Sequence, residues 1–541
     1  NTVPFIPYKY KKVAHVLLST DSDLRSRLKP FVRDIDYIHA NVQEIYVNDP
    51  LTELGMQDVI NKAENSDYII VSMLIRISMD KGISTIHSTH DKLLKNLKKL
   101  NKPIVGISFG SPYLPSYDEM DAYICTYGYG SISLSAATDA LFGRKDISGK
   151  LPVGLSEKFH EGHGINLKKK AKIFESSLNI DLSDPLQVIN NAINDSVFPG
   201  AQIFISKGDR IILNKGFGKL SYDVNAPDVT DNTIYDVASL TKVLATTPVT
   251  MKLYQSKRIG LDYLLSDFYK EYNVKNKKDI TIRHLLTHTS GLEPFVEYYK
   301  MNPVPSKKNI IEDIINKSIN YDIDTKMVYS DLGMILLTDI IEKISDSTLD
   351  KLSKRYFYNP LGMRNTLFNP ASNLKSNSLN NIAPTENDNY FRNRLLLGEV
   401  HDENAYLLGG VSGHAGLFST AYDIGIFSKM LVNEGVLLGK RYLKKNVIKK
   451  FTTRSNMPSG SDRTIGWDTP SQNGKSSAGD YFSKNSYGHL GFTGTSLWID
   501  PEQKIIVVLL TNRVHPERNN SKSMYRVRRD FHNLLMKKII D

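Results

Sequence analysis

Residues 237–254 read VASLTKVLATTPVTMKLY, and they place Ser239 and Lys242 three positions apart at the start of an apolar helical run. Residues three apart on a helix share one face, so the lysine amine can accept or relay the proton of the serine hydroxyl. The positive end of the helix disfavours a second cation, which predicts a lowered lysine pKa, and its backbone N–H groups can face a developing oxyanion. Taken alone, the pair also fits an ordinary surface helix.

Two further motifs follow in order along the chain. Tyr329, Ser330 and Asp331 form a polar triplet immediately before an apolar, helix-like stretch. Residues 487–500, YGHLGFTGTSLWID, place glycines before a predicted strand, where they let the backbone approach a bound substrate closely. A single tyrosine in such a place is more often a core ring. The ordered set of three motifs predicts a nucleophilic serine site.

Residues 182–541 resemble the superfamily of serine β-lactamases and penicillin-binding proteins, closest in style to class C β-lactamases and their esterase and amidase relatives. The motif set of that superfamily is S-x-x-K, a central polar triad and K-T-G. ITIRHLLTHTSGL (280–292) and GGVSGHAGLFSTAYD (409–423) resemble it too. The resemblance implies an α+β domain that hydrolyses an amide or ester through an acyl-enzyme. A turn between a helix and a loop should be held by Arg283, His284 and His288.

The resemblance also implies roles for single residues. Ser239 would attack a carbonyl, and Lys242 and Tyr329 would exchange the proton. Tyr329 would protonate the leaving group and later activate water. The backbone N–H groups of Ser239 and Phe492 would form the oxyanion hole. The predicted substrate-binding and oxyanion positions are Asp331, His489, Gly491 and Phe492.

Two positions depart from the family pattern. Asp331 stands where class C enzymes have asparagine, and His489 stands where β-lactamases have lysine. A neutral amide is thereby exchanged for an anion, and a permanent cation for a titratable imidazole. We therefore expect poor β-lactam hydrolysis and activity on another ester or amide. A binding protein of the same fold without activity is the alternative that these changes leave open.

Residues 12–162 show a different pattern, in which short apolar runs alternate with polar segments of helical spacing. Such alternation predicts a mostly parallel sheet with helices on its faces. The runs are VAHVLLS, DYIIVSMLI, PIVGISFG, AYICTYG and KLPVGL. Residues 107–155 resemble the C-terminal α/β sandwich domain of glycoside hydrolase family 3. In bacterial β-N-acetylglucosaminidases of that family, a preceding β/α barrel carries the catalytic residues. Only about a dozen residues precede the first run here, so we assign no catalytic residue of a glycosidase. A fragment of a glycosidase that lacks its barrel is a further alternative.

The domain boundaries follow from a lysine-rich polar passage without periodicity, which predicts a linker. We expect an α/β sandwich domain at 1–165, a linker at 166–180 and a β-lactamase-like serine hydrolase domain at 181–541. Alternating runs predict hairpins at 201–218 and 495–514, and an amphipathic helix follows the second. Strands from both ends of this domain should therefore pair in one antiparallel sheet beside a helical region.

Composition limits the remaining function classes. The chain has 541 residues, of which 40% are hydrophobic and 23% charged, as in globular proteins of two or more domains. Its net charge of +11 is spread and no nucleic-acid motif accompanies it, so we expect no nucleic-acid partner. No apolar stretch approaches the length of a membrane span. The single cysteine, Cys125, excludes an intrachain disulfide.

We expect no cofactor and no metal. His401, Asp402, Glu403 and His414 stand near one another but fit no metal template. A loop that lines the substrate cleft is a better interpretation, and ordinary hydrogen bonding within a loop is favoured over both. The two family resemblances together point to peptidoglycan turnover, with a small-molecule or muropeptide substrate.

We expect the protein to act in a bacterial periplasm or cell envelope, with the cytoplasm as the alternative. Asn1 opens the chain without a methionine, a basic leader or an apolar signal core, which predicts a processed or truncated product. The oligomeric state stays open.

Overall fold

A computed structural model describes the chain in two compact units. The first consists of Asn1–Lys172 and Val436–Arg441, and the second of Ile173–Gly435 and Tyr442–Asp541. The described residues are 2–5, 12–19, 26–38, 41–47, 50–75, 86–114, 116–168, 173–174, 176–272, 277–374, 379–455, 458–472, 474, 476–518 and 521–540. Parts of the predicted linker, residues 169–172 and 175, lie outside them. Within the described residues, no helix has the length and apolar character that a membrane span requires.

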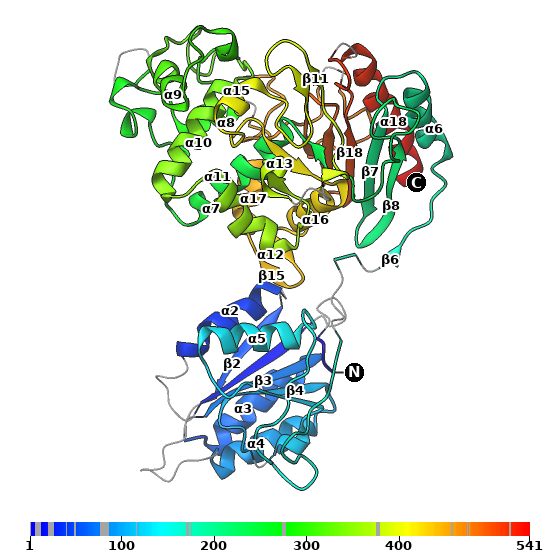
Figure 1. The fold of residues 1–541 in the computed structure, drawn as a ribbon. Helices are drawn as coiled ribbons and strands as arrows, with labels where there is room; N and C mark the ends of the chain where they lie inside the picture. Colours follow the sequence, from blue (N-terminus) through cyan, green and yellow to red (C-terminus); the bar gives the residue numbers. More distant parts are fainter. Residues whose placement is uncertain are drawn as a thin grey trace. The chain divides into compact units, whose positions relative to one another are not determined.

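The first unit is built on a five-stranded parallel sheet (Figure 1). In spatial order its strands are β2 (Val42–Val47), β1 (Val13–Ser19), β3 (Tyr68–Ile75), β4 (Ile104–Gly110) and β5 (Ala122–Cys125). Every neighbouring pair is parallel. The helices are α2 (Lys29–Ile38), α3 (Glu53–Glu64), α4 (Ser88–Lys98) and α5 (Ser131–Leu141). The predicted α/β fold of this half is confirmed.

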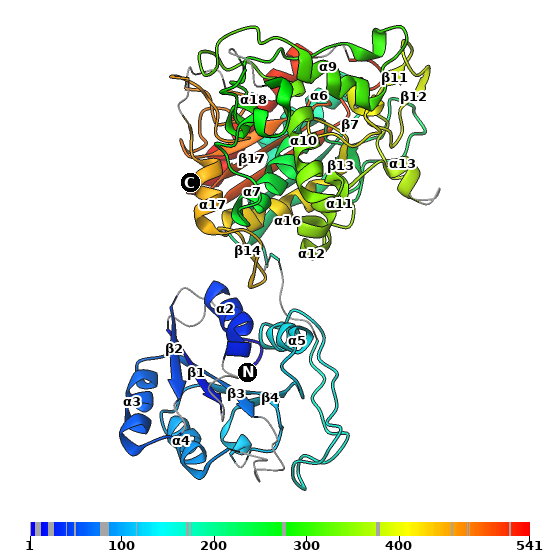
Figure 2. The ribbon, with the colours of Figure 1, turned by 90° about the vertical axis from the view of Figure 1, so that its left-hand side faces the viewer.

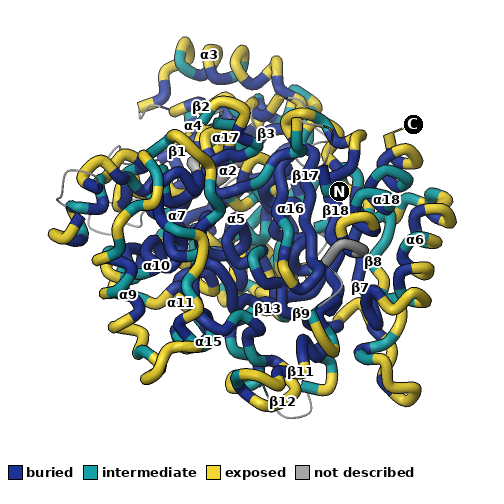
Figure 3. Tube along the Cα trace, turned by 90° about the horizontal axis from the view of Figure 1, so that it is seen from above, coloured by how far each residue is buried: buried dark blue, intermediate teal, exposed yellow. Residues whose placement is uncertain are grey.

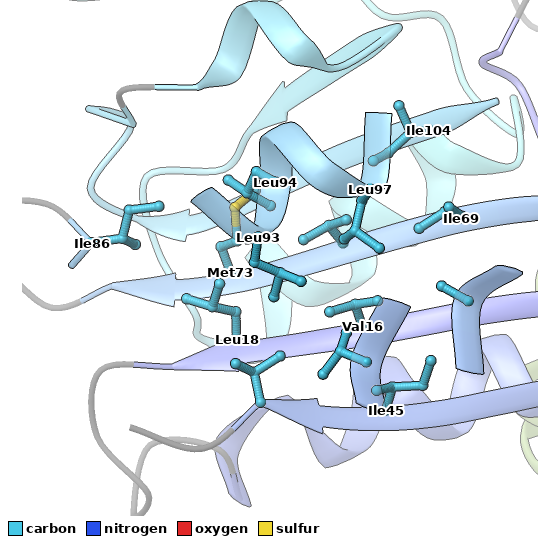
Figure 4. Packing of buried hydrophobic residues seen from close by; sticks show 14 of the residues in the cluster. Val16, Leu18, Ile45, Ile69, Met73, Ile86, Leu93, Leu94, Leu97 and Ile104 are labelled. Atoms are coloured by element: carbon cyan, nitrogen blue, oxygen red, sulfur yellow. The ribbon is translucent and has the colours of Figure 1, made fainter. Parts of the chain in front are cut away.

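Both faces of this sheet are buried, because alternate residues of each strand point to opposite sides. Val16 and Val71 pack with Leu97 of α4 in one cluster, while Leu17 and Ile70 belong to a second cluster with α2 and α5. Figure 4 shows Leu93, Leu94 and Leu97 of the helix lying over the strands that carry Val16, Ile69 and Met73. Burial on both faces explains why these strands read as continuous apolar runs.

Two details of the first unit differ from the prediction. The run KLPVGL, residues 150–155, forms bends and no strand. Pro152 lacks the N–H that a ladder needs, so the prediction of a strand there was wrong. The edge strand β2 was absent from the predicted set, because only Ile45 and Val47 of its six residues are buried. Its polar outer residues gave no apolar run.

The second unit contains a six-stranded sheet that joins its two ends (Figure 2). Its spatial order is β16 (Tyr487–Leu490), β17 (Ser496–Asp500), β18 (Ile505–Thr511), β7 (Gly200–Lys207), β8 (Arg210–Gly218) and β6 (Ser176–Ser177). β7 pairs antiparallel with β8, and β17 with β18, as the hairpin patterns predicted. The antiparallel pair β18 and β7 connects the ends, which confirms that prediction; the short β6 pairs parallel to β8.

Helices cover both faces of this sheet. Ile203 and Ile205 of β7 pack in a cluster with α6 (Ser183–Asn194) and α18 (Ser521–Ile540). Between them, Phe204 points the other way, and its ring lies 5.9 Å from that of Tyr422 in α16 (Ala421–Val432). Viewed from above, the traces of β17, β18 and α16 are dark blue, whereas α6 and α18 carry exposed residues (Figure 3).

A helical region and a small sheet complete the second unit. The small sheet has the order β10 (Leu367–Phe368), β13 (Leu417–Ser419) and β9 (Tyr235–Asp236). The main helices of the region are α7 (Thr247–Gln255), α8 (Ile282–Thr287), α9 (Lys307–Asn316), α10 (Asp331–Ser345), α11 (Leu349–Ser353), α15 (Glu403–Leu407) and α17 (Lys445–Thr452). The first two sequence motifs therefore lie in the helical region and the third on the edge strand β16.

Truncating a core leucine of the first unit should cost stability. Leu97 of α4 is fully buried, so Leu97→Ala should lower the free energy of unfolding of that unit by about 2–5 kcal/mol, as in other core truncations. Leu54→Ala is the matched control, because Leu54 of α3 is 87% exposed, and it should change stability by less than about 0.5 kcal/mol. Urea unfolding followed by circular dichroism measures both, and equal losses would contradict the packing described here.

Candidate active site

Ser239 lies in a tight turn between β9 and a helix that begins at Leu240. Ala238 in this turn has a φ of 47°, a left-handed conformation that costs a residue with a Cβ about 1–2 kcal/mol. The buried carboxylate of Asp236 accepts the N–H of Ala238 at 2.8 Å and so stabilises the turn. Ser239 itself is half-buried. Its hydroxyl is thereby held on a fixed backbone while a substrate can still reach it.

Lys242 is 1% exposed and begins a π-helical turn, Lys242–Thr246. Its Nζ donates to Ser239 Oγ at 3.1 Å and to the carbonyl oxygen of His414 at 2.9 Å. It also forms an ion pair with Asp331 Oδ1 at 2.8 Å. Two donors of the ammonium are thus used in hydrogen bonds, and the Asp331 oxygen lies at ion-pair distance. The structure thus brings Ser239, Lys242 and Asp331 together.

Tyr329 completes this group from the segment just before α10, whose N-cap is Ser330. Lys242 Nζ lies 4.7 Å from the centroid of the Tyr329 ring. The ring of His288 lies 4.6 Å from the same ring, and His288 Nδ1 accepts the backbone N–H of Ser330 at 3.1 Å. His288 therefore fixes both the ring of Tyr329 and the backbone of Ser330.

The three residues predicted to hold a turn differ in what they contact. Arg283 bonds Asp262, and His284 bonds Asp324, as expected for a turn. His288 ends α8 in a left-handed conformation but also packs against Tyr329. The purely structural interpretation of His288 therefore missed its place in the site.

The third motif is tied to the backbone just before Ser239. Thr493 Oγ1 donates to the carbonyl oxygen of Asp236 at 2.8 Å, and Thr495 Oγ1 donates to that of Val237 at 3.1 Å. Gly491 lies against the same backbone, where a Cβ would come within 2.6 Å of the Val237 oxygen. Only glycine allows this approach, which is the reason for the glycine that the sequence singled out.

Two backbone N–H groups at this junction are available to a ligand. Among the residues that the structure describes, none accepts a hydrogen bond from the backbone N–H of Ser239 or of Phe492. Phe492 is also 49% exposed, while Gly491 and Thr493 on either side of it are buried. A donor without an internal acceptor beside the Ser239 hydroxyl has the chemistry to bind a carbonyl oxygen.

The charge on Lys242 depends on Asp331. Burial opposes the charged ammonium, but Asp331 and Tyr329 outweigh burial, and the pKa of Lys242 is raised. The predicted lowering of the lysine pKa is therefore wrong, because a carboxylate at 2.8 Å acts more strongly than the end of a helix. Burial also raises the pKa of Tyr329. With both pKa values raised, Lys242 is charged and the Tyr329 hydroxyl is neutral at neutral pH.

His489 does not replace the positive charge of a lysine. It is buried, and burial lowers the pKa of its imidazole to about 4. A cation that sequence reasoning missed, Arg463, lies beside it, with Nη1 3.5 Å from His489 Nε2 and 2.8 Å from Asp468 Oδ1. The guanidinium carbon lies 5.0 Å from the centroid of the Tyr329 ring. Because no motif surrounds Arg463, only the fold could reveal it.

The residues considered as metal ligands form hydrogen-bonded pairs. His401 Nε2 lies 2.8 Å from Glu386 Oε2, and His414 Nε2 lies 2.8 Å from Asp402 Oδ1. Burial would raise the pKa of Asp402, but the His414 imidazole outweighs it and the pKa lies below its usual range. Among the described residues, no group of three or more such side chains could hold a metal ion. The Asp402 contact instead fixes His414, whose carbonyl binds Lys242.

Comparison with known families agrees with this geometry. The family model described as "Beta-lactamase" matches residues 187–529, and the model described as "Glycosyl hydrolase family 3 C-terminal domain" matches residues 9–181. The chain belongs to the beta-lactamase family. It is a serine hydrolase of the β-lactamase and penicillin-binding-protein superfamily, preceded by a domain like the C-terminal domain of glycoside hydrolase family 3.

Individual relatives match about two thirds of the chain. A protein of Salmonella agona (strain SL483) named "Putative D-alanyl-D-alanine carboxypeptidase" is 32% identical over 367 residues, which cover 62% of this chain and 83% of that protein. The hydrolase EstCE1, described as having promiscuous acyltransferase activity, has a similar fold, with a TM-score of 0.51 and 19% identity over 65% of this chain and 97% of its own. The octameric penicillin-binding protein homologue from Pyrococcus abyssi also has a TM-score of 0.51, with 23% identity over 66% and 78% of the two chains.

The neutral state of His489 should make stability depend on pH. Its pKa of about 4 in the folded chain lies below the value of 6.5 for a free imidazole, so the unfolded state binds the extra proton between these values. Stability should therefore fall as pH falls from 6.5 to 4, by up to about 3 kcal/mol from this residue. Urea unfolding of the second unit at pH 7 and pH 4.5 measures the fall, and His489→Gln should reduce it. An unchanged slope in the variant would contradict a buried neutral imidazole.

Proposed function

We propose that Ser239 is the nucleophile of this serine hydrolase, and that Lys242 and Tyr329 handle its proton. The supporting observation is the position of Lys242 Nζ, 3.1 Å from Ser239 Oγ and 2.8 Å from Asp331 Oδ1. A hydroxyl becomes a useful nucleophile when an adjacent group can remove its proton during attack. The ammonium contacts both the hydroxyl that must lose a proton and a carboxylate that can take one.

The proton route that we propose passes through the ion pair. Lys242 gives one proton to Asp331, and the freed amine takes the proton of Ser239 as Oγ attacks the substrate carbonyl. Asp331 and Tyr329 keep the lysine charged in the resting site, and burial lowers the free-energy cost of the transient neutral pair because it penalises the charged forms. Tyr329 then protonates the leaving group and is reprotonated by Lys242, which recovers its proton from Asp331. Water attacks the acyl-enzyme by the same steps in reverse.

The negative charge of the tetrahedral intermediate would be held by the N–H groups of Ser239 and Phe492. Asp331 and His489 flank the reacting group, and Gly491 allows the turn to approach Val237. Oriented backbone donors need no reorganisation during the reaction and commonly contribute factors of about 10²–10³. Thr493 and Thr495 would keep the Phe492 donor in place through their bonds to the segment before Ser239.

We further propose a muropeptide substrate, a peptide-bearing fragment of peptidoglycan with an amide or ester bond to be cut. Relatives of 31–32% identity named as D-alanyl-D-alanine carboxypeptidases support this class, as does the preceding domain similar to glycoside hydrolase family 3. The bacterial periplasm or cell envelope is the proposed compartment. The proposed domains are residues 1–165 and 181–541, joined by a linker at 166–180.

Removing the nucleophile should abolish both labelling and turnover. A fluorophosphonate should label the wild-type protein but not Ser239→Ala, because the reagent needs the activated hydroxyl. Digestion of purified muropeptides by the wild type should give products whose masses reveal loss of an amino acid, a peptide or a sugar, and Ser239→Ala should give none. Ser256→Ala, at an exposed serine on the end of α7, is the matched control and should keep the label. Equal labelling of Ser239→Ala and wild type would remove the assignment.

The relay predicts a specific effect of Asp331→Asn. This change removes the proton acceptor of Lys242 and also lowers the pKa of Lys242, because Asp331 raises it. With the relay, acylation at pH 7 should fall by about 100-fold, the scale of general acid–base catalysis. If Lys242 acts as a simple base, acylation at pH 7 should instead rise. Stopped-flow labelling between pH 6 and pH 10 separates the two outcomes. Asp262→Asn, at an exposed carboxylate paired with Arg283, should leave the profile unchanged.

A further inference from the structure

A buried arginine of the last helix contacts the turn that carries the Phe492 donor. Arg528 lies on α18 and is 8% exposed. Its Nη2 donates to the carbonyl oxygen of Gly491 at 2.9 Å and to that of Thr495 at 2.8 Å. The turn between β16 and β17 is also closed by its own backbone, because the N–H of Gly491 donates to the Thr495 oxygen at 2.7 Å. One guanidinium nitrogen therefore bonds both ends of a turn that the backbone already closes.

The bond to Gly491 acts on the peptide unit that provides the proposed oxyanion donor. The carbonyl of Gly491 and the N–H of Phe492 are the two ends of one planar, resonance-stabilised peptide bond. A donor bound to the oxygen of such a unit draws electron density toward that oxygen, which makes the N–H of the unit a stronger donor. A charged donor has a larger effect than a neutral one, because charge-assisted hydrogen bonds are the stronger kind. Arg528 therefore strengthens the Phe492 N–H from behind, on the side away from a substrate.

The positive charge of Arg528 lacks a partner of opposite sign. Among the described residues, no carboxylate lies within ion-pair distance of its guanidinium, and its Nε has no acceptor. Burial and the charge of Arg513 lower the pKa of Arg528 to about 9, so the group is still charged at pH 7. A buried cation without an anion is unfavourable. Negative charge that develops at the other end of the Gly491–Phe492 peptide unit would relieve this cost.

The other proposed donor shows the same arrangement with neutral partners. The N–H of Ser239 belongs to the peptide unit of the Ala238 carbonyl. The oxygen of that carbonyl accepts Thr241 Oγ1 at 2.6 Å and the N–H of Thr241 at 3.0 Å. Both donor units therefore accept hydrogen bonds at their carbonyl oxygens. Of the two, the unit of Phe492 has the charged partner, and this difference singles out Arg528.

We propose that Arg528 is a positioning residue whose charge, through the Gly491–Phe492 peptide unit, strengthens the N–H that binds the oxygen of the tetrahedral intermediate. The inference rests on the proposed function and deepens it, because it adds a residue to the proposed oxyanion hole. When Ser239 Oγ bonds to the carbonyl carbon, an electron pair of the C=O bond moves onto the oxygen, where the Phe492 N–H meets it. Arg528 loses no proton and touches no substrate. Its contribution is made in the transition state, so its loss should lower kcat and leave KM nearly unchanged.

Two esters that differ in one atom separate this effect from a loss of structure. 4-Nitrophenyl acetate presents a carbonyl oxygen to the N–H groups, whereas its thionoester analogue presents a sulfur, which is a weak acceptor. Arg528→Gln keeps an amide donor but removes the charge. Its kcat for the oxygen ester should fall by about tenfold, less than the loss of a whole oxyanion donor, and the oxygen-to-sulfur ratio of kcat/KM should fall with it. A smaller folded fraction would lower both rates equally, so a wild-type ratio in Arg528→Gln would overturn the proposal.

Further variants test whether the charge is responsible. Arg528→Lys keeps a cation and should hold the oxygen-to-sulfur ratio within about threefold of the wild type, although the planar fork is lost. Arg526→Gln is the matched control on the same helix, because the Arg526 side chain is 86% exposed and pairs with Asp530; it should keep both rates. If Arg528→Gln does not fold, the other proteins decide. A fall of about tenfold in Arg528→Lys, or a wild-type ratio no higher than that of hydroxide in water, would overturn the proposal.

Failure of the proposed function has a different signature. In that case the wild type would resist fluorophosphonate and would hydrolyse the oxygen ester no faster than Ser239→Ala does. Labelling at Ser239 together with a wild-type oxygen-to-sulfur ratio in Arg528→Gln would overturn the role of Arg528 alone.

Discussion

The ammonium of Lys242 is withdrawn from water, and its contacts come from three separate parts of the second unit. Ser239 precedes it on the same turn, His414 belongs to the loop before β13, and Asp331 begins α10. An unpaired charge at 1% exposure would cost several kcal/mol, so the folded site requires all three contacts at once. The same requirement places the Ser239 hydroxyl, the Asp331 carboxylate and the Tyr329 ring around one atom.

The backbone around this charge is fixed by polar contacts rather than by apolar packing alone. Asp236 holds the left-handed Ala238, and burial raises the pKa of Asp236, while the N–H groups of Ala238 and His401 limit that rise. Thr493 and Thr495 attach the turn after β16 to the same segment. The strain at Ala238 is therefore offset by hydrogen bonds from distant parts of the chain, so the serine is oriented before a substrate binds.

Sequence reasoning succeeded where the signal is local or periodic. The alternation of apolar runs gave both sheets, and the spacing of Ser239 and Lys242 gave their contact. It failed where the cause is a tertiary contact: Arg463 lies in no motif, the contact of His288 with Tyr329 joins two distant motifs, and the edge strand β2 is mostly polar. The pKa of Lys242 was predicted in the wrong direction because the distance to Asp331, 2.8 Å, is set by the packing of α10 and not by the helix that carries the lysine.

The two departures from the family pattern are electrostatically linked. Asp331 adds an anion that pairs with Lys242, and the neutral His489 removes a cation, while Arg463 is neutralised by Asp468. The charges at the centre of the site therefore balance without a substrate, because Lys242 and Arg463 each have a carboxylate partner. The two motif residues that depart from the pattern therefore change the charges around Lys242, while Ser239 and Lys242 keep the spacing of the S-x-x-K motif.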